Sequence, residues 1–149
     1  MTSLFLLFLL IILVVLSGFL SGSETAITAT SKARILYKKK KGSKRAGYVL
    51  ELLDKKDNVI STLLLSNNLV NILASSLATA FFYDLFGVEG IFYATLIMTV
   101  VIVIFAEVLP KTYAINRPNR TALLISPIIY YLNKILFVFV FIINLIVRL

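Results

Sequence analysis

The sequence predicts an all-α membrane protein, and three observations lead to this class. Hydrophobic residues make up 60% of the 149 residues and the mean hydropathy is +0.98, well above a soluble domain. Three apolar stretches are long enough to cross a bilayer as helices. Ten of the 15 lysines and arginines lie within residues 32–56, which is typical of a loop on the cytoplasmic side of a membrane.

Composition also excludes several function classes. The chain has no cysteine and no histidine, so the sequence offers no disulfide framework, no thiolate metal site and no histidine-based acid–base catalysis. An intramembrane enzyme is therefore not expected. The net charge of +8 is concentrated in one connection instead of following a groove, so nucleic acid is not an expected partner.

The first span is predicted at about residues 4–31. Glu24 is its only charged residue before the basic connection begins. The run lacks the basic residues that open a signal peptide, so a transmembrane helix is the preferred interpretation. Residues 32–56 are predicted to form juxtamembrane helices, including an amphipathic one that lies at the interface. The lysines at 38–41 are interpreted as a solvated positive-inside marker and not as a specific lipid site.

The second span is predicted at about residues 59–83, with Asp57 and Asn58 capping its start. Twenty-five helical residues reach about 37 Å, which crosses a bilayer with some tilt. The third span is predicted at about residues 91–110, and Pro110 is expected to mark its end. The turn at 84–90 contains no lysine or arginine, so it faces away from the cytoplasm. The prediction is a multi-pass cell-membrane protein with its N-terminus outside and its C-terminus in the cytoplasm.

Residues 118–149 leave two alternatives open. A fourth span would place Lys134 near the bilayer centre. A pair of juxtamembrane helices along the membrane surface would keep Lys134 at headgroup level and is the preferred prediction.

Each predicted span carries polar residues that are costly in a bilayer. Glu107 ends the third span, and intramembrane carboxylates usually mark ion pathways or partners. Asn67 and Asn71 are four residues apart, so they project from one face of the second helix. Oxygen ligands of this kind suit a hard cation such as Mg²⁺, Na⁺ or Ca²⁺. The alternative is that the small polar residues only hold helices together through hydrogen bonds.

Three blocks carry a family resemblance: LSGSETAI at residues 20–27, LLSNNLVNILA at 64–74, and AEVLPKT at 106–112 followed by NRP at 116–118. Together they resemble the transmembrane domain of the CorC/cyclin-M family of magnesium transporters, over nearly the whole chain. The resemblance implies a homodimer with three transmembrane helices per subunit and a belt of juxtamembrane helices. It also implies a dehydrated Mg²⁺ among the helices, with magnesium export coupled to sodium entry.

The resemblance assigns ligands by motif, and Ser23 joins them from the polar insertion of the first span. The candidate metal site is therefore Ser21, Ser23, Asn67, Asn71 and Glu107. A backbone carbonyl just beyond Glu107 is expected to complete the shell. Ala106 stands where the family often has glycine, which affects packing without removing a ligand. The family's cytoplasmic CBS domains are expected to be absent from this chain.

Two further expectations follow. Membrane lipids and the two cations are the expected partners besides a second copy, whose interface is expected to use Ala74, Ala78 and Thr99 for close approach. The competing functional hypothesis is a passive membrane anchor for a cytoplasmic regulatory module, in which the polar residues serve helix packing alone.

Overall fold

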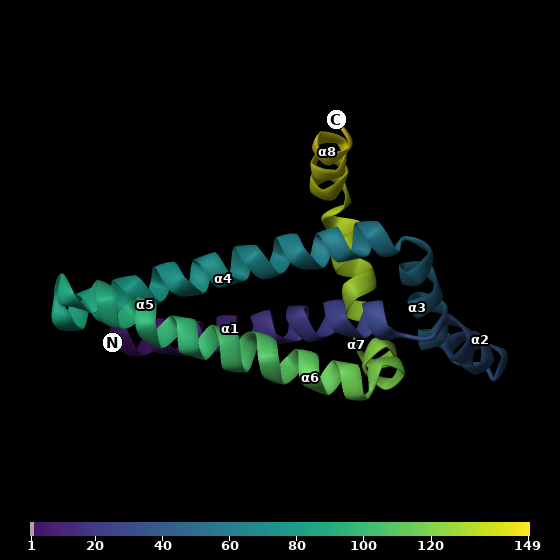
Figure 1. The fold of residues 1–149 in the computed structure, drawn as a ribbon, viewed down its shortest axis with the longest axis horizontal. Coiled ribbons are helices and arrows are strands. Elements are labelled where there is room, and N and C mark those ends of the chain that lie inside the picture. Colours follow the sequence, from purple (N-terminus) through teal and green to yellow (C-terminus); the bar gives the residue numbers. More distant parts are fainter. Residues whose placement is uncertain (1) are drawn as a thin grey trace. The chain divides into compact units, whose positions relative to one another are not determined.

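A computed structural model describes residues 2–149, with side chains from Ser3 onward, and this part of the chain contains no strand (Figure 1). The elements are α1 (Thr2–Ala29), α2 (Lys32–Lys40), α3 (Lys44–Asp54), α4 (Lys56–Phe86), α5 (Glu89–Val101), the π-helical segment η1 (Ile102–Val108), α6 (Leu109–Asn116), α7 (Pro118–Ile135) and α8 (Phe137–Arg148). Among the described residues, three helical stretches are long and apolar enough to cross a membrane: Ser3–Ala29, Lys56–Phe86 and Glu89–Asn116. The predicted all-α class with three candidate spans is confirmed.

The chain divides into two compact units. The first unit contains the chain up to Ser21 together with Ser66–Pro110, and the second contains Gly22–Leu65 together with Lys111–Leu149. The polar residues of most functional interest fall in the first unit, whereas the short helices with most of the basic residues fall in the second.

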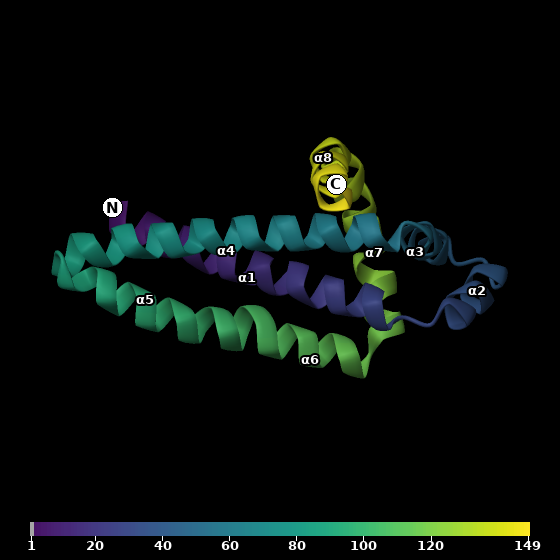
Figure 2. The same ribbon diagram turned by 45° about the horizontal axis from the view of Figure 1, so that its top comes forward.

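In the first unit, α1 lies beside the second part of α4 and beside α5, as both views of the ribbon show (Figure 1 and Figure 2). A tight turn joins α4 to α5, so these two helices run antiparallel. Gly87 adopts a φ of +63° there, which glycine tolerates best. Gly90, the second residue of α5, lies so close to the carbonyl of Phe82 that an added Cβ would overlap it. The absence of a side chain at residue 90 therefore permits this hairpin.

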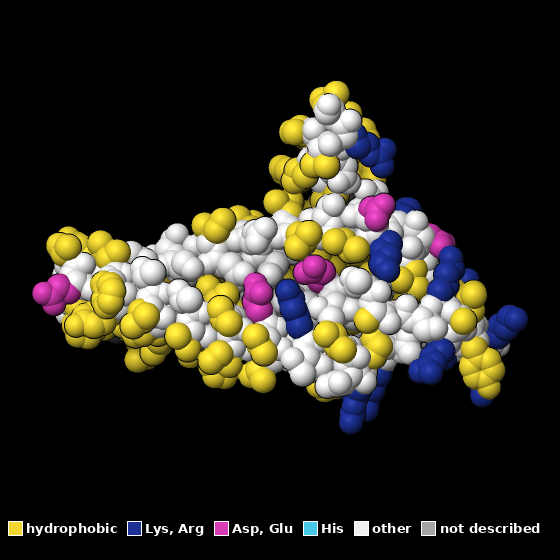
Figure 3. Space-filling view, in the orientation of Figure 1, with side chains coloured by type: hydrophobic (Ala, Val, Ile, Leu, Met, Phe, Trp, Pro, Cys, Tyr) yellow, Lys and Arg dark blue, Asp and Glu magenta, His cyan; other side chains and the backbone are white. Residues whose placement is uncertain are grey.

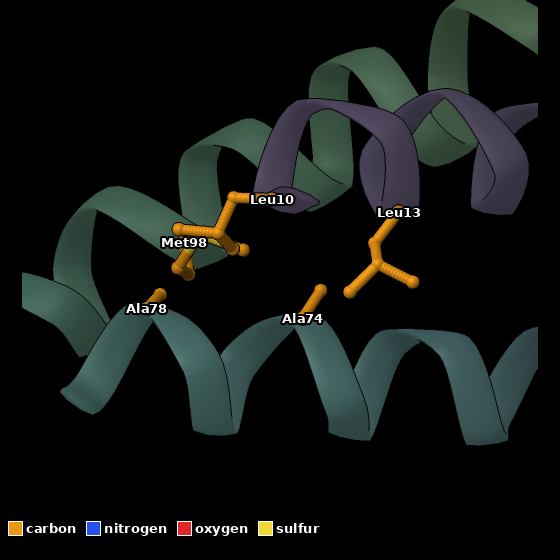
Figure 4. Packing of buried hydrophobic residues seen from close by; sticks show 5 residues of the cluster. All are labelled: Leu10, Leu13, Ala74, Ala78 and Met98. Atoms are coloured by element: carbon orange, nitrogen blue, oxygen red, sulfur yellow. The ribbon is translucent and has the colours of Figure 1, made fainter. Parts of the chain in front are cut away.

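The core of the first unit joins its three helices (Figure 4). Leu10 and Leu13 from α1 pack with Ala74 and Ala78 from α4 and with Met98 from α5. The two alanines are small, which lets the helix backbones approach closely. Both alanines are buried by this packing within one copy, since Ala74 is 1% exposed and Ala78 is 0% exposed. The expectation that these alanines face a second copy is therefore wrong.

The outer surface of the spans is apolar. Large hydrophobic side chains such as Phe5, Leu69 and Phe92 are well exposed, and hydrophobic side chains cover much of the face of α5 in view (Figure 3). Exposed apolar surface of this extent is unfavourable in water but matches lipid tails, so the helices suit a membrane environment.

The third span differs from its prediction at Pro110. The helix continues through this proline to Asn116, and seven residues ahead of Leu109, Ile102–Val108, form a wide π-helical turn. In this turn the Leu109 N–H donates to the carbonyl of Ile104, five residues back, instead of to Phe105. A proline in an ordinary helix clashes with the preceding turn and loses one hydrogen bond. The wider turn shifts the carbonyls ahead of Pro110, so the helix continues past the ring without ending.

The second unit is organised by α3 and α7. Gly42, with a φ of +91°, makes the turn between α2 and α3, and the Ser43 hydroxyl accepts a hydrogen bond from the Ala46 N–H at 3.3 Å to cap α3. The rings of Tyr48 and Tyr130 lie 5.0 Å apart where α3 packs against α7. The buried side chains of α2, α3 and α7 include Ile35, Val49, Leu52, Ile125 and Ile129.

The C-terminal segment forms two helices instead of one straight helix. α7 and α8 meet at Leu136 with a bend of 70°. This agrees with the predicted pair of helices, while their depth in the membrane stays a prediction. The start of α4 also differs from expectation: the helix begins at Lys56, so Asn58 lies inside its first turn. The Asn58 side chain does not cap the helix but accepts a hydrogen bond from Asn144 of α8 at 2.7 Å.

Candidate cation site in the first unit

Ser17 lies between two asparagines of the neighbouring helix. Its Oγ is 2.7 Å from Oδ1 of Asn67 and 2.5 Å from Oδ1 of Asn71. Asn67 and Asn71 are one turn apart on α4, so both amides reach the same turn of α1. Ser17 is fully buried and Asn67 is 6% exposed. Asn71 is half-buried, so three side-chain oxygens from two helices converge in a place with little access to solvent.

Three oxygens of this cluster share a single hydroxyl hydrogen, that of Ser17. A serine hydroxyl carries one hydrogen, so it can donate to only one of the two amide oxygens at a time. The second amide oxygen then faces another oxygen at hydrogen-bond distance. Such an arrangement leaves an excess of lone pairs, which a cation would satisfy. Rotation of one amide would instead supply N–H donors, and the cluster would then serve helix packing.

The same turn of α1 also contacts the wide turn of the third span. A Cβ added to Gly18 would lie 3.1 Å from the Phe105 carbonyl oxygen and 3.1 Å from Cγ of Pro110. It would also lie 3.7 Å from Cα of Ala106, which is fully buried. Gly18 thus permits close approach of α1 to the backbone of η1, as expected of glycine at a membrane helix interface.

The Phe105 carbonyl has lost its usual helical donors. In an α-helix it would accept from the Leu109 N–H, but that group donates to Ile104. In a π-helix it would accept from residue 110, which is a proline without an N–H. The wide turn and Pro110 together release this oxygen from the helical ladder, and it faces Gly18. The carbonyl expected to complete the shell just beyond Glu107 is a different group, and its role stays a prediction.

Four of the five predicted ligands belong to the first unit. Asn67 and Asn71 meet directly at Ser17. Ser21 is fully buried one turn further along α1, and Glu107 is half-buried in the wide turn, next to the alanine that packs against Gly18. These four residues therefore lie on the three segments that pack around Ser17 and Gly18, and their assignment as ligands stays a prediction.

The fifth predicted ligand, Ser23, belongs to the second unit and is 1% exposed. It follows Ser21 by two residues on the same helix, so the two side chains point in nearly opposite directions. Ser21 and Ser23 therefore do not share a helix face.

Ser17 was not among the predicted ligands. Its spacing of four residues from Ser21 places both hydroxyls on one face of α1, and this shared face is readable from the sequence. The quoted family block began only at Leu20, so Ser17 lay outside it. Among residues 2–149, no group of three His, Cys, Asp or Glu is close enough to hold a metal ion. The candidate ligands are therefore hydroxyl and amide oxygens together with one carboxylate.

Long apolar helices with buried serine and asparagine side chains define an integral membrane domain with a polar site among its helices. The family model described as the cyclin M transmembrane N-terminal domain matches residues 8–149. The chain belongs to this family, which is confirmed as predicted. This is a family of membrane domains and not a known enzyme family.

Relatives occur in bacteria and plants. The chain is 38% identical over 137 residues to a UPF0053 protein of Haemophilus influenzae, covering 92% of this chain and 33% of that protein. It is 41% identical over 131 residues to the UPF0053 inner membrane protein YfjD of Escherichia coli, covering 80% and 31%. A chloroplastic DUF21 domain-containing protein of Arabidopsis thaliana is 31% identical, covering 87% and 20%. The chain thus spans a third or less of the length of these relatives.

The contact of Ser17 with the asparagines can be tested by stability. Ser17→Ala should lower the free energy of unfolding by about 0.6–1.7 kcal/mol, because buried amides lose a hydroxyl partner inside the bundle. Reversible unfolding in mixed detergent micelles measures this, and a double-mutant cycle with Asn71→Ala isolates the coupling. Ser76→Ala, on the exposed face of α4, is the matched control and should change little. Equal effects of the two serine variants, or a coupling of zero, would contradict the contact.

Proposed function

We propose that this chain is the membrane domain of a magnesium transporter that binds dehydrated Mg²⁺ among its helices and exports it in exchange for Na⁺. The observation that carries the proposal is the convergence of the Ser17, Asn67 and Asn71 oxygens at 2.5–2.7 Å with one hydroxyl hydrogen among them. Membership of the cyclin M family supports the same function. Ser21 and Glu107 are the further ligands that we propose for the transported ion.

The ligand types fit a hard cation. Hydroxyl, amide, carbonyl and carboxylate oxygens suit Mg²⁺ or Na⁺, and the sequence has no thiol or imidazole that would favour zinc or copper. Mg²⁺ gives up its water reluctantly, so neutral oxygens alone would hold it poorly. Glu107 supplies the one formal negative charge among the proposed ligands. Its position in a π turn also fits, because π turns inside helices are frequent at functional sites.

Removing the charge of Glu107 tests the proposed site. Glu107→Gln keeps the size of the side chain, so it should abolish saturable stabilisation by Mg²⁺ and stop Mg²⁺ flux in vesicles while the protein still folds. Glu89→Gln is the matched control, since Glu89 is exposed at the start of α5 and should leave both measurements unchanged.

Two outcomes would overturn the transporter proposal. One is normal Mg²⁺ flux by Glu107→Gln. The other is a wild-type chain whose thermal stability Mg²⁺ does not change in a saturable way, which is the behaviour expected of a passive membrane anchor.

The proposed orientation places the N-terminus outside and the C-terminus in the cytoplasm, because the basic connection follows the first span. The chain has no cysteine of its own, so single cysteines report directly. Val88→Cys, at an exposed position in the α4–α5 turn, should react with an impermeant maleimide added outside cells, and Lys40→Cys should react only after permeabilisation. The reverse labelling pattern would contradict this orientation.

We also propose that two copies pair through α4 and α5. On this face Ser75, Thr79, Thr95 and Thr99 line a shallow hollow of about 320 Å³. The three threonine hydroxyls donate to carbonyls of their own helices at 2.7–2.9 Å, which leaves a surface of small side chains. Small residues of this kind favour close packing of membrane helices.

Crosslinking tests the pairing. In membranes, Thr99→Cys should link two copies through a short bis-maleimide, because Thr99 is exposed on the proposed face. Ile97→Cys is the control, because Ile97 lines a different groove, which α1 borders. This variant should not crosslink two copies. Equal crosslinking at both positions, or none at Thr99→Cys, would count against this interface.

A further inference from the structure

The bend between α7 and α8 borders two cavities of the second unit. One has a volume of about 270 Å³ and the other about 330 Å³. Both are lined by Asn133 and Phe137, so they adjoin at the bend. The first reaches Lys55 at the end of α3, and the second reaches Arg148 at the end of α8. Neither cavity involves a residue of the candidate cation site.

The charge around the two cavities is positive. Lys55 and Lys134 line the first cavity and Arg148 lines the second, while Glu51 is the acidic residue among the lining side chains. All three basic residues are exposed, and none of them forms an ion pair within the described part of the chain. Three positive charges against one negative charge attract an anion to this site.

Neutral polar groups hold the floor of the cavities in place. Asn144 donates to Asn58 at 2.7 Å and accepts from the Ser61 hydroxyl at 3.3 Å. Asn133 accepts from the Thr62 hydroxyl at 2.8 Å through its Oδ1, so both hydrogens of its Nδ2 are left to donate. The start of α4 thus fixes the positions of α7 and α8 side chains and leaves the amide donor of Asn133 where the two cavities adjoin.

The surface next to the cavities is apolar. Phe137 and Phe141 line the second cavity, their rings stack at 6.3 Å, and both are more than half exposed. Most other side chains of α8 are exposed and hydrophobic, and on the face in view this helix is largely covered by them (Figure 3). An anion-attracting site beside exposed aliphatic and aromatic surface matches a ligand with a charged head and hydrocarbon chains.

We propose that the α7–α8 bend and the cavity along α8 bind an anionic phospholipid, with the phosphate near Lys134 and Asn133 at the bend and the acyl chains along α8. Arg148 adds positive charge to the second cavity from the end of α8. Basic side chains next to a membrane attract anionic lipids, and the cavities add shape to that attraction. The lysine run of α2 carries more charge but does not line either cavity, so it provides a control for charge alone.

The experiment titrates the full chain in neutral detergent with phosphatidylglycerol and follows lipid-bound protein by native mass spectrometry. Lys134→Gln combined with Arg148→Gln should weaken phosphatidylglycerol binding roughly tenfold or more. Lys39→Gln combined with Lys40→Gln removes the same charge from exposed positions of α2 and should leave binding within about twofold of wild type. Both double variants should have the wild-type melting temperature in phosphatidylcholine. If a double variant melts at a lower temperature, the single variants Lys134→Gln and Arg148→Gln test the site instead.

Three outcomes would overturn the proposal. Equal loss in the two double variants would mean general charge attraction without a site. Equal affinity for phosphatidylcholine would mean that the basic residues do not select an anion. Binding of glycerol phosphate with the same affinity as phosphatidylglycerol would mean that the site binds a free phosphate ester and not a lipid, because glycerol phosphate has no acyl chains.

Discussion

One turn of α1 fixes the arrangement of the first unit, because it contacts both other helices through different atoms. Ser17 places its hydroxyl between two amide oxygens of α4, and Gly18 packs against the backbone of η1. A side chain larger than hydrogen at residue 18 would press on the Phe105 carbonyl. A residue without a hydroxyl at 17 would leave the buried amide of Asn67 and the half-buried amide of Asn71 without this partner. Adjacent positions on one helix therefore combine close backbone packing with polar contact.

The second constraint is the helical backbone ahead of Pro110. In a membrane, backbone groups must find partners inside the protein, so a proline within a span has consequences for its neighbours. Here the turn widens, the Leu109 N–H moves to Ile104, and the carbonyl of Phe105 is released toward α1. Glu107 lies within the same wide turn, so the backbone irregularity and the charged side chain occur together.

The second unit uses polar contacts for a different purpose. Asn58, Ser61 and Thr62 project from the start of α4 and bond to Asn144 of α8 and Asn133 of α7. The apolar helix α8 has exposed hydrophobic side chains on most of its surface, so these few hydrogen bonds fix its rotation more specifically than hydrophobic contact does. In the first unit the amide oxygens of Asn67 and Asn71 both lie against one hydroxyl oxygen. In the second unit the amides of Asn133 and Asn144 each have a hydrogen-bond donor or acceptor as partner.

The sequence by itself determined the class, the three candidate spans and the face shared by Asn67 and Asn71, because each depends on local hydropathy and helical periodicity. Family membership was also readable from three blocks of residues. Tertiary structure decided what depends on a neighbouring helix: Ser17 as the contact of both asparagines, Ala74 and Ala78 as core instead of interface, and Asn58 as the partner of Asn144 instead of a cap. Tertiary structure also decided that the helix continues through Pro110. Local rules place a helix end at a proline, but here the preceding turn is widened and packs against Gly18, which has room for it.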